Sequence, residues 1–299
     1  MDEIAALLAV LAAIFFALAA TLWQRASLAV GVEAGDSRAF ARLLTNTVWL
    51  LGLAAQILAV VLQAAALDRG RVAIIQPLLV TTVIWALPLG YFLTQQTITQ
   101  RHILGAAIIV AGLATFASVG DPAGGIDNAP TSDWLMAFIV LGAVCAGLLL
   151  FARRGGAGAK AAVFGTTAGM LYGVSATLMK PVVEELHAEG AAGVLESWEL
   201  WVMAVTGIVG FYLQQISLAT GRLVTSVATV SVTNPVVSVL LGVLVLQERL
   251  DQPPAWHAVL AVGGLALALL GAVLVASASD HEQEADATSG PAPMPAGVT

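Results

Sequence analysis

Charged residues are scarce in this chain. Only 10% of its 299 residues are Asp, Glu, Lys or Arg, whereas 59% are hydrophobic. A soluble domain has about 25% charged residues. The composition therefore leaves little room for a soluble domain and indicates an integral membrane protein. Cysteine is scarcer still, because the chain has one, Cys145, which excludes an intramolecular disulfide.

Acidic residues are missing from the middle of every apolar run. A carboxylate at the centre of a bilayer costs about 2.5–3.5 kcal/mol on insertion scales, and one that is kept there usually carries protons or cations. Its absence argues against a proton pump of the buried-glutamate type. It also argues against a desolvated divalent-cation site, because such cations require several oxygen ligands.

Catalytic and nucleotide-binding motifs are also lacking. The segment most similar to a P-loop, Gly155–Lys160, lacks the glycine before the lysine and the Ser or Thr after it. The four histidines have no spacing to an acid or a cysteine that makes a metal or nucleophile site. We therefore expect no enzyme activity, no cofactor and no metal. The net charge of −7 lies in loops and in the C-terminal segment, so we expect no nucleic-acid partner.

Long apolar runs are what the chain has instead. A helix that crosses a bilayer needs about 20 apolar residues, and nine runs approach that length. They cover residues 4–23, 46–66, 72–94, 103–119, 134–151, 161–180, 200–219, 223–246 and 255–277. The sequence therefore predicts an all-α, polytopic protein with about nine transmembrane helices, whose first partner is the lipid bilayer.

Two parts of the chain resemble each other. Residues 62–71 read LQAAALDRGR and residues 213–222 read LQQISLATGR, so that Leu, Gln, Leu, Gly and Arg recur 151 positions later. Each segment is followed by a proline-containing apolar run, a polar turn and another apolar run. Gly112-Leu113 then recurs as Gly264-Leu265, 152 positions later. These matches indicate that a four-helix unit is encoded twice.

This duplication defines the predicted organisation. The first repeat covers residues 1–120, a link with a connecting helix covers 121–160, and the second repeat covers 161–278. Because an odd number of crossings precedes the second copy, it starts on the opposite side of the membrane. Inverted repeats are typical of secondary transporters, which bind substrate near the membrane midplane between the halves. Residues 279–299 are acidic and rich in Ala, Gly and Pro, which predicts a disordered cytoplasmic tail.

The distribution of Lys and Arg predicts the orientation. With the N-terminus on side one, eight of these residues lie on side two and four on side one. Cytoplasmic loops carry the excess of basic residues. We therefore expect a plasma-membrane protein with its N-terminus outside and its C-terminus in the cytoplasm.

Hydrogen-bonding side chains within the apolar runs are the candidates for a substrate pathway. Those we select are Gln63, Gln76, Thr81, Tyr172, Thr177, Lys180, Gln214 and Asn234. For the Ser and Thr residues, a bond to their own helix is the more common role, and Lys180 fits a side chain that snorkels to the interface.

Prolines and glycines mark special backbone positions. Pro77, Pro88 and Pro235 are candidate helix breaks, which in corresponding helices of two repeats indicate a gated midplane site. Gly165, Gly169 and Gly173 share one helix face and predict close packing, within the monomer or in a homodimer.

These residues suggest a family. An apolar helix with a central proline that ends in Leu246–Leu250 (LQERL), followed by the glycine-rich run of residues 255–277, resembles the second half of an EamA-type transporter of the drug/metabolite superfamily. Tyr172-Gly173 with Lys180 is similar to the first helix of a repeat in that family. The resemblance implies transport, with export favoured, of a small organic metabolite or drug.

Two alternatives remain at this stage. A nine-helix layout also resembles the magnesium-transporter-like branch of the superfamily, although residues 56–66 lack the acids of that branch. The second alternative is a membrane scaffold that binds partners through its glycine face and acidic tail and transports nothing.

Overall fold

The computed structural model describes residues 3–31, 37–69, 78–119, 126, 129–247 and 256–289. At a few helical positions within these ranges it describes the backbone but not the side chain. Every regular element in these ranges is a helix, because in lipid a helix satisfies its own backbone hydrogen bonds. The helices are α1 (Glu3–Val30), α2 (Ser37–Leu44), α3 (Thr47–Arg69), α5 (Thr82–Thr94), α6 (Gln100–Val119), α7 (Thr131–Ala152), α8 (Ala157–Glu196), α9 (Trp198–Ala219), α10 (Leu223–Leu244) and α11 (Trp256–Ser289).

Seven of the described helices are long and apolar enough to cross a membrane. They are α1, α6, α7, the Ala157–Met179 part of α8, α9, α10 and the Trp256–Ala278 part of α11. An eighth candidate is the pair Arg38–Leu44 and Thr47–Gln63, which is bent by 62°, and Leu78–Thr94 is a shorter apolar helix. The prediction of an all-α protein with membrane-length helices is thus confirmed, whereas the number nine stays a prediction.

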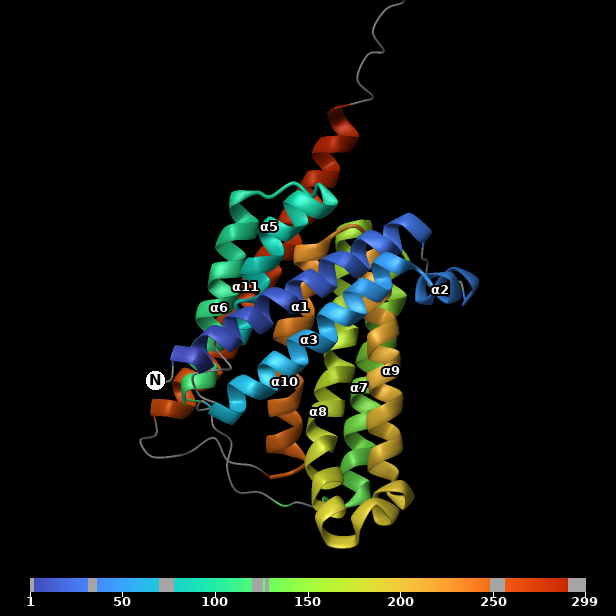
Figure 1. The fold of residues 1–299 in the computed structure, drawn as a ribbon, viewed down its shortest axis with the longest axis vertical. Coiled ribbons are helices and arrows are strands. Elements are labelled where there is room, and N and C mark those ends of the chain that lie inside the picture. Colours follow the sequence, from blue (N-terminus) through green and yellow to red (C-terminus); the bar gives the residue numbers. More distant parts are fainter. Residues whose placement is uncertain are drawn as a thin grey trace, which may run out of the picture.

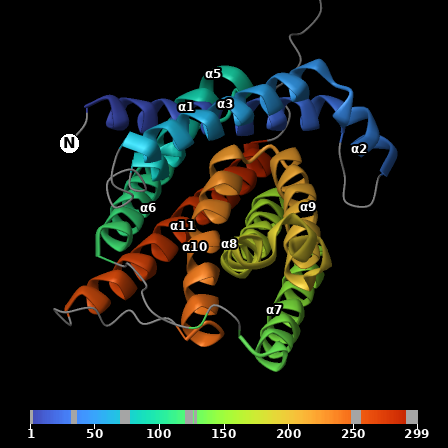
Figure 2. The ribbon, with the colours of Figure 1, turned by 60° about the horizontal axis from the view of Figure 1, so that its bottom comes forward.

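The helices associate mainly in pairs. α1 packs along α3, α6 along α11, and α8 along both α9 and α10. Figure 2 shows α1 and α3 as a layer that lies across the other helices, while α7 stands at the margin beside α8. The largest core cluster joins α1 and α3 to α5, α6, α9, α10 and α11, so both halves of the chain contribute to one interior.

Glycines set the closest approach between α6 and α11. A Cβ atom built on Gly112 would lie 2.5 Å from the carbonyl oxygen of Gly264, and one built on Gly264 would lie 2.6 Å from the carbonyl oxygen of Gly112. Gly105 and Gly271 approach each other in the same reciprocal way, at 2.9 and 2.7 Å. Since rising numbers on α6 meet falling numbers on α11, the two helices are antiparallel.

Two helices extend more than ten residues beyond the apolar runs that predict them. α8 continues beyond the run of residues 161–180, through Pro181 and a break at Gly190 (φ 72°), to Glu196. α11 continues to Ser289, eleven residues beyond Ala278, so the described part of the predicted tail is helical. Residues 290–299 lie outside the described ranges.

Charged side chains separate towards opposite ends of the helices. The described basic side chains lie at what we call the cationic end, namely Arg25, Arg38, Arg42, Arg101, Arg153, Arg154, Lys160 and Arg222. The described carboxylates lie at the other, acidic end, namely Glu3, Asp133, Glu184, Glu185, Glu189, Glu196 and Glu199. Thus α1 and α7 run from an acid to a base, whereas α8 runs from a base to acids.

Candidate functional site

Aromatic rings from both halves of the chain meet where α1, α3 and α9 come together; the three helices are labelled in Figure 1. Trp23 of α1 lies 5.2 Å, between ring centroids, from Phe211 of α9, and Trp49 of α3 lies 6.1 Å from the same ring. The indole Nε1 of Trp23 donates a hydrogen bond to the carbonyl oxygen of Trp49, at 3.2 Å. Both tryptophans are buried, with 3% and 5% exposure. These rings therefore form a closed seam between α1, α3 and α9.

Buried amide side chains without a full set of partners occur on two of these helices, α1 and α9. The Oε1 atom of Gln215, on α9, accepts a hydrogen bond from the indole Nε1 of Trp49 at 3.2 Å, but its Nε2 has no partner in the described structure. Gln24, on α1, is fully buried, and neither its Oε1 nor its Nε2 has a partner there. We call Trp23, Trp49, Phe211 and Gln215, together with Gln24, which follows Trp23 in the chain, the tryptophan–amide cluster.

This excess of polar groups is chemically unusual. A buried amide without a hydrogen bond costs about 1–3 kcal/mol on the scale of protein mutations, and most buried polar groups are paired. One turn after Gln24 on α1, the buried hydroxyl of Ser27 is also without a partner among the described residues. The cluster therefore has hydrogen-bond donors and acceptors that a small polar molecule, such as water or a substrate, could satisfy.

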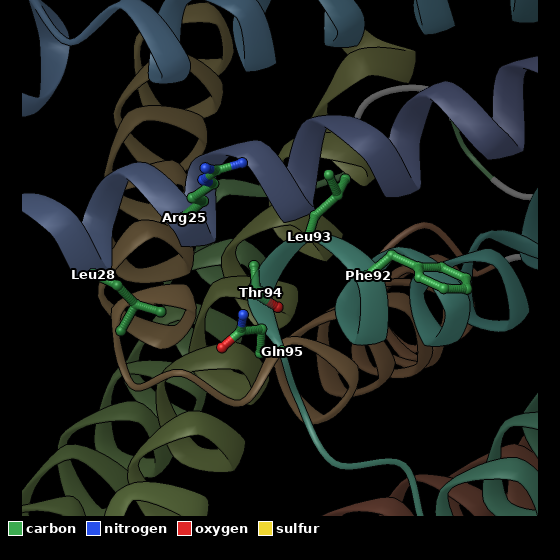
Figure 3. Close-up of a pocket in the computed structure, with 6 residues that line it drawn as sticks. All are labelled: Arg25, Leu28, Phe92, Leu93, Thr94 and Gln95. Atoms are coloured by element: carbon green, nitrogen blue, oxygen red, sulfur yellow. The ribbon is translucent and has the colours of Figure 1, made fainter.

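A shallow groove lies next to the cluster, at the cationic end. It has a volume of about 390 Å³ and is lined by Arg25 and Leu28 of α1 and by residues 92–95 at the end of α5. Figure 3 shows Arg25 across the groove from Thr94 and Gln95. Gln24 and Arg25 are neighbours in the chain, so the same segment of α1 borders the buried cluster and the exposed groove.

A second polar contact joins the two halves at Gln96, the residue after Gln95 of this groove. The Oε1 atom of Gln96 accepts a hydrogen bond from the backbone N–H of Leu223, at 3.1 Å, and its Nε2 has no partner in the described structure. Gln95 just before it has a left-handed backbone (φ 54°). The end of α5 is thereby held to the beginning of α10.

The structure brings two of the predicted pathway residues together. The hydroxyl of Tyr172, on α8, donates a hydrogen bond to the Oε1 atom of Gln214, on α9, at 2.8 Å. Thr81 and Thr177 bond instead to the carbonyl oxygens of Leu78 and Gly173 in their own helices.

The remaining predicted residues are dispersed. Asn234 is half-buried on α10, and Gln63 is half-buried on α3. Gln76 and Pro77 lie outside the described residues, as does the side chain of Lys180, although α8 runs through that position. Pro88 is exposed on α5, whereas Pro235 is half-buried inside α10.

The three predicted packing glycines of α8 all face α10. A Cβ built on Gly169 would lie 3.0 Å from the carbonyl oxygen of Val230, and one on Gly173 would lie 2.9 Å from that of Asn234. At Gly165 the Cβ would overlap the hydroxyl of Thr229. These positions therefore let the two helices approach closely within one chain.

The predicted set does not include the amides of the cluster. Gln214 is in that set, yet its neighbour Gln215 is the one that is fully buried. Gln24 directly follows Trp23 in an apolar run, a signal that could have identified it, whereas Gln215 lies between Gln214 and Ile216 and has no such neighbour. Among the described residues, no group of three or more His, Cys, Asp or Glu side chains is placed to hold a metal ion.

These observations define an all-helical protein with membrane-length helices and a buried polar cluster between its two halves. The chain is similar to an uncharacterized protein of Corynebacterium glutamicum, with 29% identity over 206 residues, which cover 69% of this chain and 71% of the relative. No protein-family model matches the chain. No solved structure matches it either.

Proposed function

We propose that the protein is a secondary transporter that exports a small organic metabolite or drug by alternating access between two inverted halves. The observation that carries the proposal is the tryptophan–amide cluster. Its amide and indole groups come from α1 and α3 on one side and from α9 on the other, and they are buried with hydrogen-bonding capacity to spare. Polar groups held inside a membrane protein commonly mark a substrate pathway.

Support for the inversion comes from equivalent positions in the proposed repeats. Under a shift of 152 residues, Gly112 of α6 corresponds to Gly264 of α11, and these two glycines touch each other in an antiparallel pair. Equivalent helices must run in opposite directions when the repeats are inverted. The same shift relates Gln95 to Gln247, which are the two described non-glycine residues with positive φ.

The count of nine crossings is part of the proposal. To the seven membrane-length helices it adds the bent pair that ends in α3 and the shorter helix Leu78–Thr94. Thr81 interrupts this shorter helix at its beginning. Discontinuous helices accompany the binding sites of many transporters.

The separation of charge supports an orientation in the plasma membrane. Basic residues accumulate on the cytoplasmic side of membrane proteins, and the described Arg and Lys side chains all lie at the cationic end. We assign this end to the cytoplasm, with the N-terminus outside. The cluster then closes the cytoplasmic side of the seam between the halves.

Transport by the reconstituted protein tests the proposal. Liposomes containing the full chain would be assayed with labelled amino acids, nucleosides and the cationic dye ethidium as probes. Replacing Gln215 by Leu removes one polar contact with a substrate and should slow the flux of an accepted probe about tenfold, the equivalent of about 1.4 kcal/mol. Gln100→Leu is the matched control, because Gln100 is exposed at the start of α6.

Two outcomes would contradict the proposal. One is the absence of flux above that of empty liposomes for every organic probe, together with a flux of Mg²⁺ reported by an entrapped dye, which would favour the divalent-cation alternative. The other is unchanged transport by Gln215→Leu, which would remove the cluster from the pathway.

A further inference from the structure

A larger groove opens at the cationic end between α7, α8 and α9. These three helices stand side by side in Figures 1 and 2, with α8 packed against both of the others. The groove has a volume of about 710 Å³, which lies in the range of about 300–1,000 Å³ typical of small-molecule sites. No residue of the tryptophan–amide cluster lines this groove.

The lining of this groove divides into a basic part and an apolar part. Arg153, at the end of α7, and Lys160, in the first turn of α8, supply the basic part. The apolar wall includes Leu149, Ala152, Phe164, Leu213, Ile216 and Ala219. A ligand that fits both parts has an anionic head and a hydrocarbon body.

The two cations are available to an anion. Both side chains are exposed, and neither forms an ion pair within the described part of the chain. The described carboxylates lie at the acidic end, on the far side of the membrane-length helices. The attraction of this pair for an anionic group is therefore not cancelled by a neighbouring acid.

The outer surface of α7, beside the groove, is apolar. In α7 the buried residues are at its two ends, Trp134 and Ala152, and large apolar side chains such as Leu150 and Phe151 are exposed. Leu150 and Phe151 are 59% and 66% exposed and lie three and two residues before Arg153. A hydrocarbon chain in the groove would therefore be continuous with the lipid that covers α7.

A basic amphipathic helix lies next to the groove. Ala39 and Leu43 of α2 are fully buried, whereas Arg42 is exposed. Phe40 of the same helix packs against Tyr212, which lines the groove, with 5.0 Å between the ring centroids. Basic amphipathic helices of this kind lie at the surface of membranes that contain anionic lipids.

We propose that this groove binds one anionic phospholipid of the cytoplasmic leaflet. The phosphate lies between Arg153 and Lys160, and an acyl chain runs along Phe164, Leu213 and Ile216. Basic pockets between transmembrane helices on the cytoplasmic side bind the head groups of anionic lipids by this combination of contacts. The bound lipid fills the space between α7 and α9, so it stabilises the attachment of α7 to the rest of the molecule.

The test measures binding of defined lipids to the purified full chain in a neutral detergent. Dioleoyl phosphatidylglycerol is the anionic probe, dioleoyl phosphatidylcholine is the neutral probe with the same acyl chains, and inorganic phosphate is the soluble probe. We expect phosphatidylglycerol to raise the melting temperature and to remain bound in native mass spectra. Phosphatidylcholine and phosphate should do neither at the same concentration, because each satisfies one part of the groove only.

Charge variants locate the site. Removing both cations in Arg153→Gln/Lys160→Gln should weaken phosphatidylglycerol binding about 30-fold, since each basic residue near an anionic surface contributes about 1 kcal/mol. The matched control is Arg25→Gln/Arg101→Gln, which removes two exposed cations from the same end but outside the groove. Equal binding by the two double variants would overturn the proposal.

A variant that keeps both charges tests the apolar wall. Ala219→Phe places a larger side chain in the groove and should weaken binding of phosphatidylglycerol in the same assay. If inorganic phosphate stabilises the protein as much as the lipid does, the site is an anion site and not a lipid site. Each measurement reports binding alone, so its failure is distinct from a failure of transport.

Discussion

Single residues decide how closely the helices of this protein approach one another. Gly112 and Gly264 bring the backbones of α6 and α11 into contact, and Gly165, Gly169 and Gly173 do the same for α8 and α10. In lipid the hydrophobic effect does not drive helix association, so close van der Waals packing along small residues contributes a large part of it. The glycines of α7 are different, because a Cβ at Gly142 or Gly147 would meet nothing within 4 Å.

Gly112→Ala should destabilise the protein. The added Cβ would lie 2.5 Å from the carbonyl oxygen of Gly264 and 2.6 Å from the backbone nitrogen of Ala268, and backbone atoms move only with their helix. We expect the free energy of unfolding to fall by about 1–3 kcal/mol. Gly147→Ala is the control and should be neutral or slightly stabilising, since Ala is the better helix former by about 1 kcal/mol. Equal melting temperatures for the two variants would contradict this interpretation.

Gln24→Leu should separate stability from function. The substitution removes an amide that is fully buried without a partner in the described structure. The substrate-free protein should therefore gain about 1–3 kcal/mol of stability, while transport falls. Thermal unfolding and liposome flux, measured on the same preparation, check the two effects. A variant that loses stability as well as transport would show that Gln24 is a structural residue.

The helices differ in how much of their length packs against other helices. The contacts of α11 with α6 involve Gly264, Ala268, Gly271 and Val275, which all precede Ala278. The membrane-length part of α11 ends at that residue, although the helix runs on to Ser289. The close glycine contacts between α6 and α11 therefore lie within the membrane-length part of α11.

Truncation after Ala278 distinguishes a transporter from a scaffold. For a transporter we expect the free energy of unfolding to change by less than about 0.5 kcal/mol, as for surface changes away from the core, and flux to be unchanged. A scaffold that binds its partner through the C-terminal segment would lose that partner instead. Retention of flux by the truncated chain is the measurement that decides between them.

The molecule as a whole has a polarity that its charges define. All described basic side chains lie at one end and all described carboxylates at the other. This arrangement places the α7–α8 turn and the α9–α10 turn on the same side as Arg25, with the end of α8 on the opposite side. If the cationic end is cytoplasmic, these two turns are inaccessible from outside the cell, whereas the end of α8 is accessible.

Cysteine labelling tests this orientation. Cys145 is the single cysteine and would be replaced by alanine. A cysteine at Glu196 should react with a membrane-impermeant maleimide in intact cells, whereas one at Arg154 should react only after permeabilisation. Both positions are exposed, so access is not limited by burial. The reverse pattern would invert the assigned topology.

The sequence predicts the helices better than it predicts the site. Apolar runs of membrane length identify α1, α6, α7, α9 and α10 within a few residues at most ends, because any such run must form a helix in lipid. They do not identify the break at Gly190 or the extension of α8 to Glu196, since these depend on local backbone geometry and on good helix formers outside the apolar run.

The site depends on helix rotation, which composition does not encode. Gln214 and Gln215 are adjacent, yet they point about 100° apart on a helix of 3.6 residues per turn. As a result Gln214 reaches Tyr172 of α8, whereas Gln215 reaches Trp49 of α3. Which of the two meets the other half is decided by packing between distant helices, and no local pattern in residues 213–222 reports it.

The contact between Gly112 and Gly264 has a consequence for the origin of the chain. If the two halves descend from one duplicated gene, these glycines were once the same residue, and their contact was a residue of one subunit meeting its own copy in another. Such a contact lies on the twofold axis of an isologous dimer. The ancestral four-helix protein would then have assembled from one subunit inserted upright and one inserted upside down.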